Sequence, residues 1–268
     1  MSRLKGPFGV VLIIVAVLSV LLMMAPLIII SVSAFDPISL RFPIKGFTLE
    51  WFKELFTNAK FMKSMWTSLK LGLASSLIST VLALFVSIGL RYCPVKARNS
   101  INSLMLAPLF VPSIVLGLAL YQLTYMMFDT RQFWMLIFGH IVLTLPYPLR
   151  TIMAGLESLP KTLDEASMSV GASPLRMVAT VLVPNVKPSF FSGWLLAFVQ
   201  SWNDFNVAIW MSSNKFYPLS IQIYSFTRES FNPMLAAMCV VLVLFSAAIV
   251  LIMDKLFGLS TVAGIRTT

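Results

Sequence analysis

The sequence predicts an all-α integral membrane protein. Hydrophobic residues make up 58% of the 268 positions, charged residues make up 11%, and the mean hydropathy is +0.89. These values lie well outside the usual range of soluble domains. Six apolar runs are long enough to cross about 30 Å of hydrocarbon at about 1.5 Å per residue. No hydrophilic block of domain size separates the runs, so we expect one transmembrane domain over residues 1–268.

The six predicted spans differ in how clearly they are bounded. They lie near residues 8–33, 67–90, 101–123, 133–155, 189–211 and 234–253. The first exceeds the apolar core of about 7–15 residues that a secretory signal uses, so we interpret it as a helix. The third and fourth spans are interrupted by Pro108, Pro112, Pro146 and Pro148. Such kinks need neighbours or water to satisfy the freed carbonyls, so these spans either border a pore or are kinked by packing.

The charges of the short loops predict the orientation. Residues 91–100 carry three basic side chains, whereas residues 124–132 carry one basic side chain offset by one acidic side chain. Because Lys and Arg collect in cytoplasmic loops, we place residues 91–100 in the cytoplasm. Six spans then put both termini and residues 156–188 on the same side. The net charge of +10 is spread among loops without a basic tract, which favours contact with anionic lipid headgroups over nucleic acid.

The loop after the first span contains a short amphipathic segment, EWFKELF, at residues 50–56. Helical spacing puts Trp51, Phe52, Leu55 and Phe56 on one face. This pattern predicts an interfacial helix on the outer leaflet.

Between the fourth and fifth spans lies a polar segment, TLDEASMSVGASPLRMVATVLVP, at residues 162–184. Thr162 precedes Glu165 at the spacing of a capping box, which predicts a helix start, and Gly171 can stop that helix in a left-handed conformation. The apolar positions that share one face of this helix are Leu163, Ala166 and Val170.

A second short helix is predicted directly after the glycine. Ser173 followed by Pro174 is a helix-start pattern, and Pro184 and Pro188 are expected to end the helix. Its apolar side consists of Leu175, Val178, Ala179 and Leu182. Two short helices at an angle would form a projection on the cytoplasmic face. An elaborate loop that only connects two spans could contain the same helix-start and helix-stop residues.

The residues from Glu165 to Pro184 resemble the EAA signature of binding-protein-dependent ABC importer permeases of the type I, MetI-like fold. That signature reads E-A-A, three residues, G, nine residues, then a hydrophobic residue, any residue, L and P. The matching positions are Glu165, Ala166, Gly171, Val181 and Pro184, while Ser167 and Val183 replace the second alanine and the leucine. The likeness continues in APLFVPSIVLGLAL, GHIVLTLPYPLRTIMAGLESLP and QSWNDFNVAIWMSS, which are similar to the spermidine/putrescine branch.

This resemblance implies that residues 160–184 form a coupling hairpin, whose coupling helix inserts into a groove on a cytoplasmic ATPase subunit. The residues assigned to coupling are Thr162, Glu165, Ala166, Ser167, Gly171, Ala172 and Pro184. The implied partners are a second permease, homologous or identical, two ATPase subunits, an extracytoplasmic solute-binding protein and the lipid of the bacterial inner membrane. No phosphate-binding G-x-x-x-x-G-K-[ST] loop occurs, so ATP and Mg would be bound by the partner ATPase. The chain itself would hold no cofactor and would not be an enzyme.

A substrate path is predicted around a carboxylate in the fifth span. Asp204 lies deep in the apolar run, where a charge usually faces water or a partner. Trp202 and Asn203 beside it could help to pass a cation, and Ser113 stands where the polyamine branch often has a glutamate. The alternative for Asp204 is a hydrogen bond at a subunit interface. His140 stands alone, so we expect a hydrogen bond across helices or a place in the path, and no metal site.

The favoured substrate is a polyamine-like cation, with phosphonate, ferric ion or another small solute as alternatives. A secondary transporter would need its own coupling-ion site and usually an inverted repeat, and neither is evident in the sequence. A membrane enzyme would need a convergent set of catalytic groups, which the scattered acidic residues and the single histidine do not supply.

Overall fold

Helices make up nearly all of the structure, as the sequence predicts. The computed structural model describes residues 7–229 and 232–257, and both termini, predicted to be cytoplasmic, lie outside these ranges. Within the described ranges the β structure amounts to one bridge between Ser213 and Phe216. The chain divides into two compact units. Of the described residues, one unit contains 7–62 together with 223–229 and 232–245, and the other contains 63–222 together with 246–257.

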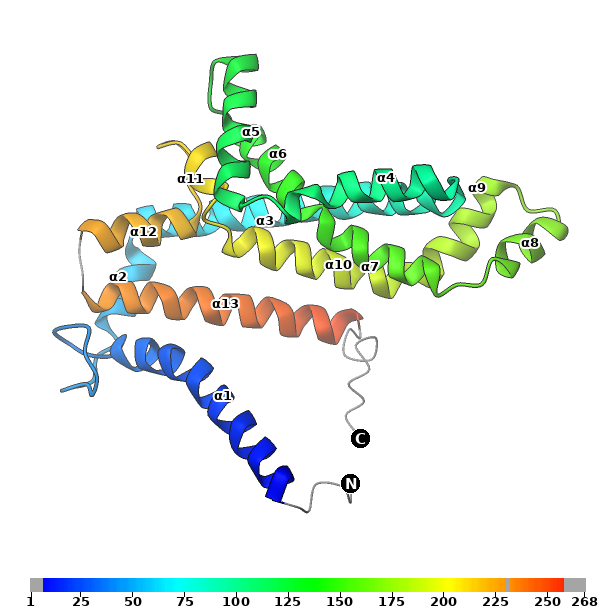
Figure 1. Ribbon diagram of the computed structural model, residues 1–268. Helices are drawn as coiled ribbons and strands as arrows, with labels where there is room; N and C mark the ends of the chain where they lie inside the picture. Colours follow the sequence, from blue (N-terminus) through cyan, green and yellow to red (C-terminus); the bar gives the residue numbers. More distant parts are fainter. Residues whose placement is uncertain (1–6, 230–231, 258–268) are drawn as a thin grey trace. The chain divides into compact units, whose positions relative to one another are not determined.

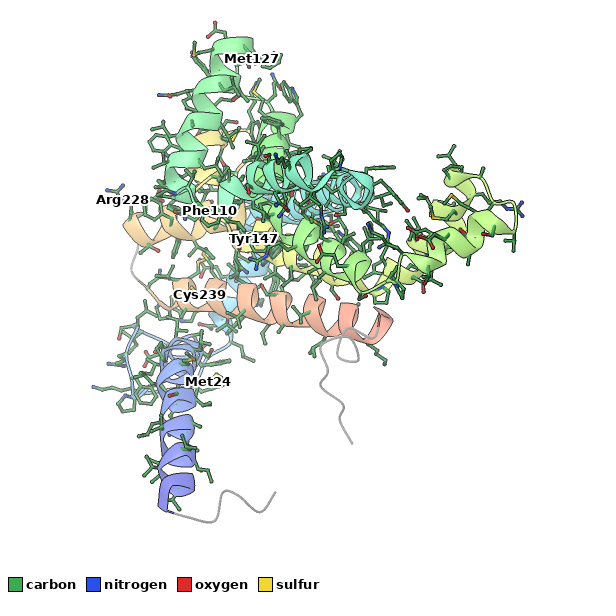
Figure 2. All side chains as sticks on the ribbon, turned by 45° about the vertical axis from the view of Figure 1, so that its right-hand side comes forward. Met24, Phe110, Met127, Tyr147, Arg228 and Cys239 are labelled. Atoms are coloured by element: carbon green, nitrogen blue, oxygen red, sulfur yellow. The ribbon has the colours of Figure 1, made fainter. Side chains whose placement is uncertain are left out.

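The first unit contains α1 (Pro7–Ser33), α2 (Glu50–Thr57), the start of α3 (Ala59–Tyr92), the end of α12 (Leu219–Glu229) and the first part of α13 (Pro233–Phe257). Large hydrophobic side chains from Val10 to Ile29 on α1 are exposed, and Figure 2 shows side chains projecting on both sides of this helix, where Met24 is labelled. A helix that is apolar all round needs lipid or another chain as its surroundings. The predicted first span is therefore confirmed as a continuous helix.

The loop between α1 and α2 is organised around the carboxylate of Asp36. The backbone N–H groups of Ile38, Ser39 and Lys45 donate to it at 2.9–3.0 Å, and Arg41 Nε donates at 2.9 Å. These bonds, led by that from Ser39, hold the pKa of the Asp36 carboxyl well below its usual range. A polar loop of this length is thus ordered by one side chain.

The predicted amphipathic helix exists as α2. Its Trp51 Nε1 donates to the Asp36 carbonyl at 2.9 Å, and the ring centroids of Phe52 and Phe35 lie 5.2 Å apart. Leu55 is fully buried, whereas Phe56 remains half exposed. Much of the apolar face therefore packs on the protein's own loop, and contact with the outer leaflet stays a prediction.

The second unit carries the remaining helices. After α3 they are α4 (Val95–Leu106), a 3₁₀ turn (Ala107–Leu109), α5 (Ser113–Phe128), α6 (Phe133–Thr144), α7 (Pro146–Glu157), α8 (Thr162–Ser169), α9 (Pro174–Met177), a π-helical turn (Val178–Leu182), α10 (Val183–Asn203) and α11 (Ala208–Met211), followed by the start of α12. Figure 1 shows α7 and α10 side by side, with α8 and α9 projecting at one end of the unit and α5, α6 and α11 gathered at the other.

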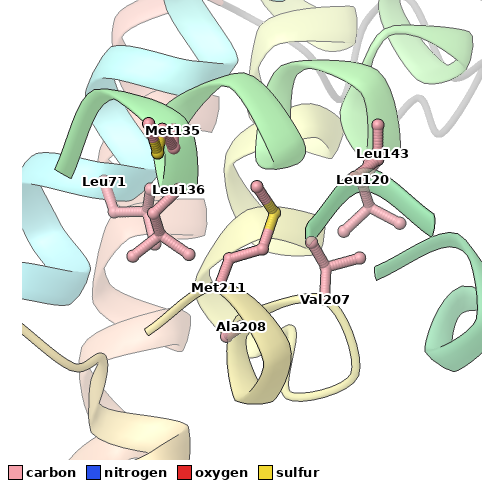
Figure 3. Packing of buried hydrophobic residues seen from close by; sticks show 8 residues of the cluster. All are labelled: Leu71, Leu120, Met135, Leu136, Leu143, Val207, Ala208 and Met211. Atoms are coloured by element: carbon pink, nitrogen blue, oxygen red, sulfur yellow. The ribbon is translucent and has the colours of Figure 1, made fainter. Parts of the chain in front are cut away.

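Two apolar clusters stabilise this unit. One joins α3, α5, α6 and α11 through Leu71, Leu120, Met135, Leu136, Leu143, Val207, Ala208 and Met211 (Figure 3). The other joins α3, α7, α9 and α10 through Ala83, Leu149, Ile152, Leu156, Met177, Leu182 and Val186. The second cluster lies where the projecting helices begin, so the base of the hairpin rests on a packed core.

Not all of the six predicted spans are unbroken helices, and breaks in the third and fourth were expected from their prolines. Among residues 7–229 and 232–257, three helices are long and apolar enough to cross a membrane, namely Gly9–Ser33, Ala59–Tyr92 and Pro233–Ile252, and up to five spans result if each bent pair counts as one. The third predicted span is bent by 102° between residues 109 and 113, and the fourth by 44° between residues 144 and 146. Both bends fall at the prolines that predicted them, because proline lacks an N–H and restricts the residue before it.

The fifth predicted span, residues 189–211, is also interrupted. Its helix α10 ends at Asn203, and a separate turn of helix, α11, follows at Ala208. As a single helix, α10 is not among those that are long and apolar enough to cross a membrane.

Candidate functional site

The segment that carries the family-like signature forms a helical hairpin, which comprises α8, the turn at Gly171, α9 and the π-helical turn. Gly171 has φ +87°, and the N–H of Ala172 donates to the Ser167 carbonyl at 3.1 Å, so the predicted left-handed stop is confirmed. Ser173 is the N-cap of α9, where its Oγ accepts from the N–H of Arg176 at 3.4 Å. The predicted start of the second helix is therefore confirmed as well.

The predicted capping box of the first helix is not formed. α8 begins at Thr162 itself, and the preceding Lys161 already has a helical conformation, with φ −65° and ψ −21°. The N–H of Glu165 donates to the Lys161 carbonyl at 3.2 Å in place of the Thr162 hydroxyl. A capping residue needs extended backbone angles, and a turn that begins at Pro160 removes that possibility.

The prolines predicted to end the second helix do not end it. Pro184 lies in the first turn of α10 and Pro188 lies inside it, and the helical path runs without a break from Pro174 to Asn203. The π-helical turn just before Pro184 changes the bonding register where the proline ring would otherwise meet the preceding turn. The side-chain amide of Asn185 donates to the Val181 carbonyl at 2.7 Å and satisfies one of the carbonyls in this wide turn.

The hairpin exposes apolar side chains at its tip. Val170 is 86% exposed and Leu175 is 84% exposed, and Leu163 and Met168 are also exposed. The predicted coupling residues are exposed at Thr162, Glu165, Ala166, Gly171 and Pro184 and half-buried at Ser167 and Ala172. The apolar face predicted for the first helix of the hairpin is thus exposed in this chain, whereas Asp164 from the polar face of the same helix is buried.

Asp164 is buried because it meets the last two residues of α3. Arg91 Nε donates to Asp164 Oδ2 at 3.0 Å and Arg91 Nη2 donates to Oδ1 at 3.2 Å, so the guanidinium and the carboxylate pair through both oxygens. The Tyr92 hydroxyl donates to Oδ2 at 3.0 Å. The Arg91 and Asp164 side chains are only 6% and 7% exposed. Sequence reasoning missed this pair, because the two residues lie 73 positions apart and nothing local marks them as partners.

A buried polar cluster lies at the opposite end of α10 from the hairpin. His140 Nδ1 and Ser201 Oγ lie 2.8 Å apart, and Ser201 Oγ lies 3.0 Å from Ser75 Oγ. Asp204 Oδ2 accepts from the N–H groups of Val207 and Ala208 at 3.0 Å, and His140 Nε2 lies 3.7 Å from the same oxygen. The hydrogen bond predicted for His140 across helices is therefore formed, and Asp204 serves as the N-terminal acceptor for α11.

The other residues of the predicted path lie in different surroundings. Trp202 is buried, and its ring stacks on Phe198 with centroids 6.0 Å apart. Asn203 is exposed, and its amide donates to the Val199 carbonyl. Ser113, at the start of α5, accepts from the amide of Asn206 at 2.8 Å. The fold brings His140 and Asp204 together, and it leaves Asn203 as the exposed member of the Trp202 to Asp204 stretch.

Comparison with known proteins agrees with this geometry. The family model described as "Binding-protein-dependent transport system inner membrane component" matches residues 79–260, which include the hairpin and all of the polar cluster except Ser75. The chain belongs to this family. It is therefore a multi-pass inner-membrane permease subunit of a binding-protein-dependent ABC importer, and such a subunit is not itself catalytic and binds no cofactor.

Its relatives include polyamine permeases and solved importers. The chain is 24% identical to the spermidine/putrescine permease PotC of Haemophilus influenzae, over 85% of this chain and 88% of the relative, and 25% identical to the putrescine permease PotI of Escherichia coli, over 84% and 83%. A chain of a bacterial ABC transporter for alginate import superposes with a TM-score of 0.72 at 15% identity, covering 91% of this chain and 94% of that chain. A chain of the methionine transporter MetNI gives 0.62 at 20% identity, covering 75% and 98%. These structures confirm the type I importer fold.

Proposed function

We propose that the chain is the translocation subunit of an importer for a polyamine-like cation. The substrate class is supported by the polyamine permeases among the relatives, which match over more than four fifths of this chain. The complex would contain a second permease, identical or homologous, two ATPase subunits and an extracytoplasmic binding protein. Both termini of the chain would lie in the cytoplasm.

The observation that carries this proposal is the exposed apolar tip of the hairpin. Val170 and Leu175 project from a short, well-formed pair of helices instead of packing into the chain. Exposed apolar side chains at the end of a rigid projection fit insertion into a groove of another protein. We therefore assign the hairpin as the coupling element for the ATPase, with Thr162, Glu165, Ala166, Ser167, Gly171, Ala172 and Pro184 as its framework.

A substrate path would run past the polar residues at the other end of α10. The solvent-accessible polar side chains that we assign to the path are Asn203, Ser113 and Asn206. The buried residues His140, Trp202 and Asp204 would support the path without lining it. The buried carboxylate of Asp204, held by α11 and close to His140, would supply negative potential for a passing cation.

The test is a cross-linking and transport experiment on the purified complex. In a background with Cys93 and Cys239 replaced by Ser, a Val170→Cys variant should cross-link to a co-purifying ATPase subunit. Met126→Cys is the matched control, because Met126 is 85% exposed on α5 at the other end of the unit and should not react. Proteoliposomes with the binding protein should then take up radiolabelled spermidine only when ATP is supplied.

The outcomes separate the parts of the proposal. A chain that purifies without an ATPase and transports alone under an ion gradient would contradict the assignment of the hairpin. ATP-driven uptake of a different solute, identified by mass spectrometry on the binding protein, would contradict the polyamine assignment alone.

A further inference from the structure

The C-terminal end of α3 contacts several parts of the hairpin base at once. We propose that Arg91, supported by Tyr92, is a positioning residue for energy coupling: it joins α8 to α3 and α7, so that displacement of the hairpin moves these helices together. This inference rests on the proposed coupling role of the hairpin.

The contacts of Arg91 reach three successive parts of the chain. Besides both oxygens of Asp164, the guanidinium donates to the carbonyl of Leu156 near the end of α7. It also donates to the carbonyls of Leu159 at 3.2 Å and Pro160 at 3.5 Å in the connection to α8. One side chain therefore holds the end of α7, the connecting residues and the first turn of α8.

These contacts use groups at the ends of the helices. The carbonyls of Leu156 and Pro160 also accept from the N–H groups of Leu159 and Leu163 at 3.2 Å, and each carbonyl has a second lone pair for the guanidinium. The last carbonyls of a helix have no partner within it, and a cation near them is favoured by the helix dipole. Asp164 lies in the first turn of α8, where a negative charge is favoured for the same reason. Tyr92 adds a bond to Asp164 and lies 3.7 Å from the sulfur of Met177 in α9, so the second helix of the hairpin is reached as well.

The chemistry of arginine makes this a stiff connection. Its planar guanidinium presents five donors in a fixed arrangement, whereas a lysine offers one compact charge on a flexible stem. The pair is almost fully buried, so water does not compete for its bonds. Apart from this pair, α8 is joined to α7 by the short connection of residues 158–161, and it packs against α9 and the π-helical turn of the hairpin.

The second limb of the hairpin reaches the same helix by another route. α9 continues through the π-helical turn into α10, and α10 meets α3 again where Ser201 Oγ lies 3.0 Å from Ser75 Oγ and Trp194 Nε1 donates to Ser76 Oγ at 3.0 Å. The two limbs thus form a closed frame with α3, and Arg91 is the polar link at its hairpin end.

A nearby ion pair provides a matched control. Arg98 of α4 pairs with Glu157 at the end of α7, but these side chains are 33% and 58% exposed. Exposed pairs contribute little, because water and salt screen them. Replacing Arg98 removes the same type of charge close to the same helix end without breaking the link to α8.

The experiment measures solute transported per ATP hydrolysed by the full complex, with binding protein, in proteoliposomes. The variants are Arg91→Lys, Arg91→Gln, the double variant Arg91→Gln/Asp164→Asn, and the control Arg98→Gln. The double variant leaves no unpaired buried charge and should therefore assemble better than Arg91→Gln alone. We expect it and Arg91→Lys to lower the ratio by at least about fivefold, the lower end of typical coupling between sites, while Arg98→Gln leaves the ratio unchanged.

Three results would overturn the inference. If the double variant recovers both assembly and the wild-type ratio, the pair serves folding alone. If the double variant still fails to assemble, the pair is likewise needed for folding and not for coupling. A control that falls as far as the Arg91 variants would indicate a general charge effect. If the wild-type complex itself shows no ATP-coupled uptake, the proposed function fails, and that result is separate from both.

Discussion

Gly193 lies where α10 packs against α7 with no room for a side chain. A Cβ at this position would overlap Thr151 Oγ1 and would lie 2.7 Å from Pro148 Cα. The hydroxyl can rotate away, but the backbone atom of Pro148 cannot. Even Gly193→Ala therefore forces one helix to move away from the other.

The size of the effect follows from these distances. Carbon atoms in contact are optimally separated by about 3.5–4.0 Å, so α10 must shift by roughly 0.8 Å or more along the whole contact. Overpacking of this kind costs about 1–3 kcal/mol in the free energy of unfolding. We expect Gly193→Ala to lower the apparent Tm by on the order of several degrees.

The assay is thermal unfolding of the purified complex, followed by fluorescence-detected size-exclusion chromatography. Two controls stay within the same unit. Gly89→Ala adds a Cβ with nothing within 4 Å, and Gly72→Ala meets the ring of Phe198 at 3.0 Å, a side-chain contact that is less close than the backbone contact at Gly193. Gly89→Ala should be neutral or stabilising by up to about 1 kcal/mol, since alanine is the better helix former. A Gly193→Ala variant as stable as Gly89→Ala would refute the close-packing argument.

Three further predictions concern single residues. Asp204→Ala should lower the free energy of unfolding by about 0.5–2 kcal/mol, because it removes the acceptor for two N–H groups at the start of α11; thermal unfolding measures this loss. Asp204→Asn should retain most of the stability, and it should lower polyamine transport in an uptake assay if the charge serves the path. Gly171→Ala should cost roughly 1–2 kcal/mol because of its positive φ and reduce cross-linking of Val170→Cys, and an equal loss with Gly171→Asn would argue against backbone strain as the cause. The loop around Asp36 should stay ordered above about pH 4 and lose its order as the pH falls through the lowered pKa of the folded state, because protonation of the carboxylate breaks the hydrogen bonds that it accepts. Limited proteolysis of residues 37–48 measures this loss, and Asp36→Asn should remove the pH dependence.

The long helices could be predicted closely because lipid selects unbroken apolar runs. Residues 8–33 and 234–253 correspond to α1 (Pro7–Ser33) and α13 (Pro233–Phe257). The bent helices could not be predicted as well. The positions of the prolines predicted the breaks near Pro112 and Pro146. The angles of 102° and 44° depend on how the segments on each side of a break pack against neighbouring helices, which the local sequence does not show.

The hairpin separates local from non-local information. Gly171 and Ser173 act through their own backbone angles and the next few N–H groups, so their roles were readable in the sequence. The Thr162 and Glu165 pattern also fits the interior of a helix, and only the conformation of Lys161 decides between the two. The pair of Arg91 and Asp164 depends on packing between distant elements, and local reasoning has no access to it.

The helical path from Pro174 to Asn203 has a consequence for how this part of the chain can vary among relatives. Its thirty residues span about 45 Å, and each residue advances the helix by about 100°. Inserting or deleting one residue within it would rotate the Ser201 end by nearly a third of a turn relative to Val170, and would separate Ser201 from His140. Length changes should therefore be rare between these two points and should accumulate in connecting segments such as residues 212–218.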